Sequence, residues 1–120
     1  MGRRAFFSSV GCAARGLAFA FRTQRSLRWQ GCVACLVAAA ALWVRVARWE
    51  WAALIFSIGF VFCAEVLNTA VELTIDMIKA TEHPIARIVK DVAASAVLVA
   101  VAVAVGIGWL VFHPYLVHPT

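Results

Sequence analysis

Residues 92–112 read VAASAVLVAVAVAVGIGWLVF, a run of 21 residues without a charged side chain. A helix needs about 20 predominantly apolar residues to cross a bilayer core about 30 Å thick. This stretch therefore predicts a transmembrane helix. Its many small side chains would let neighbouring helices approach it closely.

The whole chain has the composition of a membrane protein. Of its 120 residues, 64% are hydrophobic and 14% are charged, whereas about 25% are charged in typical soluble domains. A soluble domain of this length could not hide so much apolar surface, because small domains bury too small a fraction of it. We therefore expect one membrane-embedded domain over residues 1–120.

Two more apolar runs precede this helix, so we expect transmembrane helices at about residues 29–48, 51–78 and 91–112. Residues 5–22 carry apolar side chains along one side at helical spacing. That pattern is typical of an amphipathic helix on a membrane surface, with a partly ordered tail as the alternative. The expected fold class is thus all-α, with three transmembrane helices and an N-terminal surface helix.

The basic residues are distributed unevenly between these apolar runs. Six of the eleven Lys and Arg residues precede the first run, two lie between the first and second, and three lie between the second and third. Lys and Arg collect on the cytoplasmic side of membrane proteins. We therefore expect the N-terminus inside and the C-terminus outside, and we attribute the basic surplus to orientation and anionic lipid rather than to nucleic-acid binding.

Cys32 and Cys35 form a CxxC pair, which can indicate a zinc or redox site. Both fall in an apolar helix with no second pair of ligands, and cysteine in such a place behaves as a small hydrophobic residue. We expect a packing role for them.

The second predicted helix carries four polar residues on one face: Glu65, Asn68, Glu72 and Asp76. Their spacing of i, i+3, i+7 and i+11 aligns them along the helix. An acidic side chain at the bilayer centre costs about 2.5–3.5 kcal/mol on insertion scales. Each of these acids therefore needs a partner, a metal ion or water.

Depth separates the expected roles of these acids. If the outer edge of the core lies near Trp51, a core of about 30 Å ends near residue 71. Glu72 and Asp76 would then meet water at the cytoplasmic interface, where a hydrated cation can reach them. Glu65 would lie roughly 10 Å deeper, where it can meet the head of a lipid and is a candidate base.

A hydrated acidic metal site above a membrane-embedded base, with Lys90 nearby, suits phosphoryl transfer from a metal–nucleotide to a lipid hydroxyl. Two other interpretations stay open at this point. The acids could form an interhelical polar network that fixes packing, or they could line a cation or proton pathway in a small channel.

Two blocks of this sequence resemble a known family. The first is EVLNTAVE at 65–72, followed by Asp76, and the second is KDVAASAVL at 90–98. With the intervening His83-Pro84, they resemble the prokaryotic diacylglycerol kinase family, which includes undecaprenol kinases. The likeness runs from about residue 15 to residue 112. It implies a homotrimeric kinase of the bacterial cytoplasmic membrane, with active sites shared between subunits, that uses ATP and Mg²⁺.

The resemblance also implies roles for individual residues. Glu65 would take the proton from the primary hydroxyl of diacylglycerol or undecaprenol. Glu72 and Gln24 would bind the metal ion, with Asn68 and Asp76 in support. The residues implied to meet the nucleotide are Gln24, Glu72, Glu82, His83, Lys90 and Asp91. Those implied to meet the lipid are Glu65, Arg28 and Ala94.

Gln24 departs from the family pattern, because many members have a glutamate at this position. Gln30 is likewise neutral where some members carry an acid. An amide offers an oxygen but no charge, so we expect Mg²⁺ to be held more weakly or to depend more on Glu72 and the phosphates.

Overall fold

The computed structural model describes residues 2–78 and 83–117, which fold into helices without any strand. The all-α prediction is therefore confirmed. In chain order the helices are α1 (Arg3–Thr23), α2 (Arg25–Val44), α3 (Arg48–Met77) and α4 (Pro84–Val117). As expected, three of them, α2, α3 and α4, are long and apolar enough to cross a membrane.

The turn between α2 and α3 begins earlier than the sequence suggested. The first span was expected to reach residue 48, but α2 ends at Val44 because Arg45 adopts a left-handed backbone conformation, with φ of 57°. Such a conformation is uncommon for any residue except glycine. It closes α2 here, since the Arg45 N–H donates to the carbonyl of Ala41.

Helices α3 and α4 also differ in their bounds from the expected spans. Helix α3 begins at Arg48 rather than 51, and its first turn is capped because the Glu50 carboxylate accepts a hydrogen bond of 2.8 Å from the Ala47 N–H. Helix α4 runs without interruption from Pro84, seven residues before the expected span at 91. Proline suits this first position because the N–H it lacks would be unpaired there.

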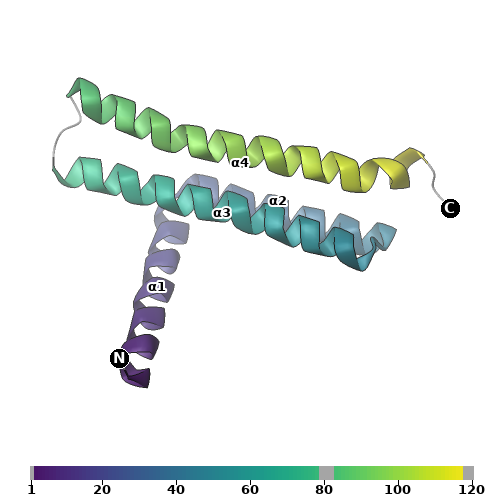
Figure 1. Cartoon of the computed structure of the whole chain (residues 1–120), viewed down its shortest axis with the longest axis horizontal. Helices are drawn as coiled ribbons and strands as arrows, with labels where there is room; N and C mark the ends of the chain where they lie inside the picture. Colours follow the sequence, from purple (N-terminus) through teal and green to yellow (C-terminus); the bar gives the residue numbers. More distant parts are fainter. Residues whose placement is uncertain (1, 79–82, 118–120) are drawn as a thin grey trace.

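Helix α3 contacts both α2 and α4, and the three run along the long axis of the molecule (Figure 1). Helix α1 leaves this bundle sideways at Gln24, which has an extended backbone and separates α1 from α2. We call this corner the elbow. At the end where α3 leads to α4, both helices extend beyond the elbow (Figure 1), so the last turns of α3 stand past the level of α1.

The interior of the bundle is small. One cluster of buried residues lies near the α2–α3 turn, and another lies midway along α3 and α4, where Val61 and Ala64 meet Ala100. The two alanines let α3 and α4 approach closely, as small residues do between membrane helices.

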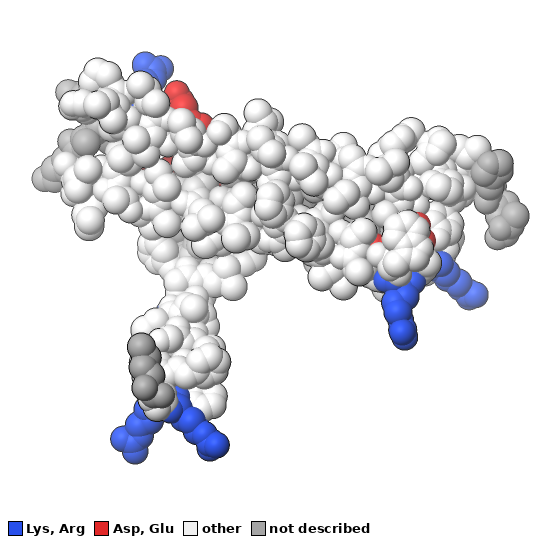
Figure 2. Space-filling model, in the orientation of Figure 1, with Lys and Arg blue, Asp and Glu red and all other residues white. Residues whose placement is uncertain are grey.

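Most large apolar side chains lie outside this interior. Leu36, Leu98 and Leu110 are each exposed over at least 70% of their surface. In the view of Figure 2, the charged side chains gather at the two ends of the bundle and at the tip of α1, and the surface between the ends is uncharged. An apolar flank bounded by charged ends is the surface expected of a bundle whose solvent is lipid.

Candidate functional site

Glu65 is buried at the level of the elbow. Its side chain lies on α3 with 6% of the residue surface exposed. The Ser26 hydroxyl, in the first turn of α2, donates a hydrogen bond of 2.5 Å to Glu65 Oε1. A buried carboxylate is costly unless it is hydrogen-bonded, and this bond between two helices supplies one partner.

One turn further along α3, Asn68 and Glu72 lie together. Asn68 is 9% exposed, and its Nδ2 donates to Glu72 Oε1 at 3.4 Å. The other amide atom, Oδ1, is buried and has no hydrogen-bond partner among the described residues. Buried polar atoms are almost always satisfied, so this oxygen is available to a ligand, a water molecule or a second chain.

The face ends in an ion pair between α3 and α4. Lys90 Nζ lies 2.9 Å from Asp76 Oδ1, and both side chains are partly exposed. Pairs so exposed contribute about 0–1 kcal/mol, so this contact orients the two side chains more than it stabilises the bundle. Asp91 follows Lys90 and is exposed, and His83 lies at the start of α4, where its Nδ1 accepts a hydrogen bond from the Ile85 N–H.

The bond to Ser26 places Glu65 beside the elbow, and Glu72 and Asp76 follow toward the end of α3. Glu72 lies roughly 10 Å beyond Glu65 along the helix axis. Helix α3 continues past the elbow (Figure 1). The row of acids thus begins at a buried glutamate and ends at an exposed aspartate.

The remaining residues implied by the resemblance lie in several places. Gln24 forms the elbow itself and is half-buried, and its side chain makes no hydrogen bond to the acids of α3 in the described ranges. The Arg28 guanidinium donates to the carbonyls of Phe21 and Arg22, so it caps the end of α1. Ala94 is exposed one turn after Lys90, and Glu82 lies outside the described residues, as does Lys79.

The oxygen atoms on the acidic face of α3 suit a hard cation such as Mg²⁺ that also binds water or phosphate oxygens. Within residues 2–78 and 83–117, no group of three or more His, Cys, Asp or Glu side chains comes close enough to hold a metal ion. The oxygens present are the carboxylates of Glu72 and Asp76 and the unpaired amide oxygen of Asn68. Magnesium is commonly bound by one or two carboxylates together with water and substrate phosphates, so these residues fit a nucleotide-bound Mg²⁺.

An apolar cavity of about 360 Å³ lies between α2, α3 and α4. It begins near Gln30 and Phe62, which are within about one helical turn of Ser26 and Glu65 respectively, and continues to Gly108. The Gln30 Oε1 atom is buried without a hydrogen-bond partner in the described part of the chain. If the head group of a lipid contacts Glu65, its hydrocarbon chain can occupy this apolar cavity, which extends from the elbow toward the α2–α3 turn.

Sequence reasoning missed two hydrogen-bonded contacts. It assigned no role to Ser26, because a single serine carries no signal until α2 is packed on α3. It also assigned none to Glu50, which is 5% exposed and accepts hydrogen bonds from the Tyr115 hydroxyl and the Ala47 N–H. A glutamate at the third position of a helix is a capping signal when Ser, Thr, Asp or Asn stands at the N-cap. Ala47 stands there instead, so the sequence carried no such signal.

Comparison with known proteins gives one family and several relatives. The family described as prokaryotic diacylglycerol kinase matches residues 11–112. The chain is 39% identical over 111 residues to undecaprenol kinase of Bacillus subtilis (strain 168), covering 92% of this chain and 90% of that protein. It is 32% identical over 103 residues to diacylglycerol kinase of Escherichia coli (strain K12), covering 86% and 84%. It is 30% identical over 95 residues to diacylglycerol kinase of Haemophilus influenzae, covering 79% and 80%.

Proposed function

The chain belongs to the prokaryotic diacylglycerol kinase family, and from this premise we propose that it transfers the γ-phosphoryl group of ATP to the hydroxyl of a membrane lipid. The names of its relatives support a lipid kinase. The family and the three apolar helices together indicate a multi-pass protein of the bacterial inner membrane. The observation that carries the proposal is the position of Glu65, which is buried at the elbow between an apolar cavity and an acidic, exposed helix end.

Glu65 acts as the general base in the proposed reaction. Its carboxylate takes the proton of the lipid hydroxyl while that oxygen bonds to the γ-phosphorus and the bond from this phosphorus to the β–γ bridging oxygen breaks, releasing ADP. Base catalysis of this kind requires the carboxylate within hydrogen-bonding distance of the reacting hydroxyl. A membrane-embedded position favours a lipid hydroxyl over one dissolved in water.

The acids beyond Glu65 bind the nucleotide and its Mg²⁺. Glu72 is the principal carboxylate ligand, with Asn68 and Asp76 beside it and Gln24 offering a neutral oxygen from the elbow. Mg²⁺ held there with the nucleotide would supply positive charge against the phosphates. The residues that complete the nucleotide site are Glu82, His83, Lys90 and Asp91. Lys90 already lies next to Asp76, so a cationic side chain is placed beside the carboxylates.

Undecaprenol is the favoured acceptor, with diacylglycerol as the second. The relative named undecaprenol kinase shares 39% of aligned residues, and the Escherichia coli relative named diacylglycerol kinase shares 32%. The apolar cavity below Glu65 supports an acceptor with a long hydrocarbon chain. Arg28 and Ala94 are the further residues proposed to contact this lipid.

The active assembly is a homotrimer with its N-terminus in the cytoplasm. One chain alone brings no three acidic, His or Cys side chains together as a metal site in the ranges described, and this supports sites completed by a second copy and by the nucleotide. The mass of the detergent-solubilised protein, corrected for bound detergent, tests this assembly.

One assay tests the function directly. The purified protein is given labelled ATP and Mg²⁺, with diacylglycerol and undecaprenol offered in parallel vesicles. We expect labelled lipid in both, and faster labelling of undecaprenol. Labelling of neither lipid, together with cation flux through protein-containing liposomes, would instead support a channel.

A further inference from the structure

The Ser26 hydroxyl contacts the proposed base, yet the reaction as described gives this side chain no part. We propose that Ser26 is a positioning residue that holds the Glu65 carboxylate in place for proton transfer. This inference rests on the proposed lipid kinase activity. It concerns a side chain for which neither the acid pattern nor the family resemblance predicted a role.

The geometry of the contact leaves half of the carboxylate free. An ionised glutamate only accepts hydrogen bonds, so the Ser26 hydroxyl must be the donor in the 2.5 Å contact with Oε1. No other side chain of the described residues donates to this carboxylate. Oε2 therefore stays available to the acceptor hydroxyl, while Oε1 is held from the neighbouring helix.

Ser26 is itself exposed, but the residues around it pack the elbow against the bundle. Leu27, the next residue, is completely buried. Phe21, at the end of α1, packs against Phe62 of α3 with ring centroids 5.7 Å apart. These apolar contacts seat the elbow on α3 without any help from the Ser26 hydroxyl, so the hydroxyl is free to serve orientation rather than packing.

The same bond connects the base to the predicted metal ligand at the elbow, between α1 and α2. Gln24 precedes Ser26 by two residues, and Glu65 and Glu72 are two turns apart on α3. The hydrogen bond from Ser26 therefore fixes the position of the Glu65 carboxylate relative to Gln24 at the elbow. Both the acceptor hydroxyl and the phosphoryl group must meet within hydrogen-bonding distance of Glu65, and small errors in such placement slow transfer strongly.

A matched pair of variants isolates the hydroxyl. Ser26→Thr keeps the hydroxyl. Ser26→Val introduces a side chain of nearly the same shape as threonine but without the hydroxyl. We expect Ser26→Val to lower kcat about tenfold, the order expected for one hydrogen bond to an ionised group. The KM for the lipid should change by less than about twofold, since uniform substrate binding is untouched. Ser26→Thr should keep most of the wild-type kcat.

Two further measurements separate positioning from a structural role. In a Glu65→Asp background, where the shortened side chain no longer reaches Ser26, the Thr and Val substitutions should give equal rates. Thermal unfolding of Ser26→Val should stay close to that of wild type, whereas Leu27→Ala, which leaves a cavity in the elbow, should unfold at a lower temperature. Ser9→Ala, an exposed hydroxyl on α1, serves as the control for activity.

Equal kcat values for the Ser26→Val and Ser26→Thr enzymes would overturn the inference while leaving the kinase activity established. A loss of rate in Ser26→Val that persists unchanged in the Glu65→Asp background would also overturn it, because the hydroxyl would then act through something other than the base. A wild-type protein that phosphorylates neither lipid would refute the proposed function, and this inference with it.

Discussion

At the scale of residues, α3 contains two buried glutamates that differ in their hydrogen bonding. Glu50 accepts from both the Tyr115 hydroxyl and the Ala47 N–H. Glu65 accepts from the Ser26 hydroxyl alone among the described side chains. The two bonds to Glu50 tie it to the start of α3 and to α4, which gives it a structural role. Glu65 is the proposed base because it lies at the elbow, where the row of acids begins.

Glu65→Gln should lower the rate of lipid phosphorylation about 10²–10⁴-fold, the range lost when a general base is removed. The amide keeps the size of the side chain and can still bond to Ser26, so nucleotide binding and thermal unfolding should change little. Transfer of label from ATP to lipid measures the rate. Glu50→Gln is the matched control and should stay active; full activity of Glu65→Gln would remove the base assignment.

Gln24→Glu should reduce the Mg²⁺ concentration needed for half-maximal activity. A carboxylate at the elbow adds a negative charge and a preferred ligand type for this cation. Titration of Mg²⁺ at fixed ATP measures the effect, which we expect to be about tenfold, equivalent to roughly 1.4 kcal/mol. Gln24→Leu, which removes the oxygen, should shift the requirement upward. An unchanged requirement in both variants would exclude Gln24 from the metal site.

At the scale of elements, the length of a helix determines which of its residues lie outside the hydrocarbon core. Helix α3 has 30 residues, and at 1.5 Å per residue it spans about 45 Å, against about 30 Å for a hydrocarbon core. It therefore extends beyond the core, and its last turns pass the elbow from which α1 departs (Figure 1). Glu72 and Asp76 lie on these turns, so the helix itself carries them beyond the hydrocarbon core.

Tyr115 connects the far end of α4 to α3 through Glu50. Tyr115→Phe should lower the midpoint of thermal unfolding by several degrees, because Glu50 stays buried and loses a donor. The catalytic rate should stay within about twofold of wild type, since no substrate contact is removed. Ser95→Ala, which removes an exposed hydroxyl bonded within α4, is the control. An unchanged midpoint would mean that the Tyr115 contact adds no stability.

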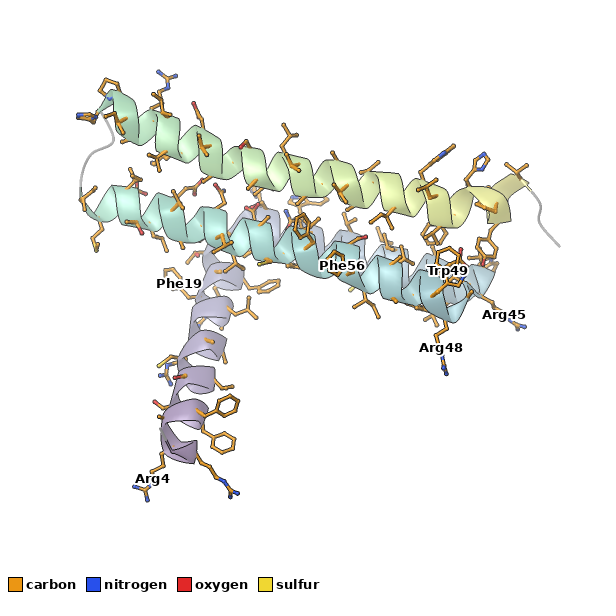
Figure 3. The ribbon with its side chains drawn as sticks, in the orientation of Figure 1. Arg4, Phe19, Arg45, Arg48, Trp49 and Phe56 are labelled. Carbon is orange, nitrogen blue, oxygen red and sulfur yellow. The ribbon has the colours of Figure 1, made fainter. Side chains whose placement is uncertain are left out.

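At the scale of the whole molecule, the positions of the charged residues indicate which parts of the protein lie at the two membrane surfaces. Arg45, Arg48 and Trp49 lie at the end of the bundle where α2 turns into α3 (Figure 3). Arg4 lies at the tip of α1, which leaves the bundle nearer the other end (Figure 3). Charged and aromatic residues of this kind anchor helices at membrane interfaces, so the two ends correspond to the two bilayer surfaces.

The proposed orientation predicts which cysteines an impermeant reagent can reach. In intact spheroplasts of a variant lacking its four cysteines, Arg48→Cys should react with a membrane-impermeant maleimide. The same variant carrying only Cys12, on α1, should react only after the membrane is broken. Two basic residues near the α2–α3 turn against nine elsewhere support this orientation. The reverse labelling pattern would place the acidic end of α3 outside, away from cytoplasmic ATP.

Much of the fold was predictable because apolar runs of spanning length have few alternatives. Residues 92–112 indicated a helix by themselves, and α4 contains them. The ends of helices were less predictable, because they depend on local backbone conformation. Arg45 ends α2 in a left-handed conformation, although nothing in an arginine favours one.

The sequence by itself determined the number of spanning helices and the row of acids on one face of α3, because both follow from hydropathy and helical periodicity. Only the tertiary structure decided which partners these acids meet. Packing of α2 on α3 brings Ser26 to Glu65, and packing of α3 on α4 brings Lys90 to Asp76. Contacts between residues 39 and 14 positions apart depend on how helices pack, and periodicity within one helix carries no information about that.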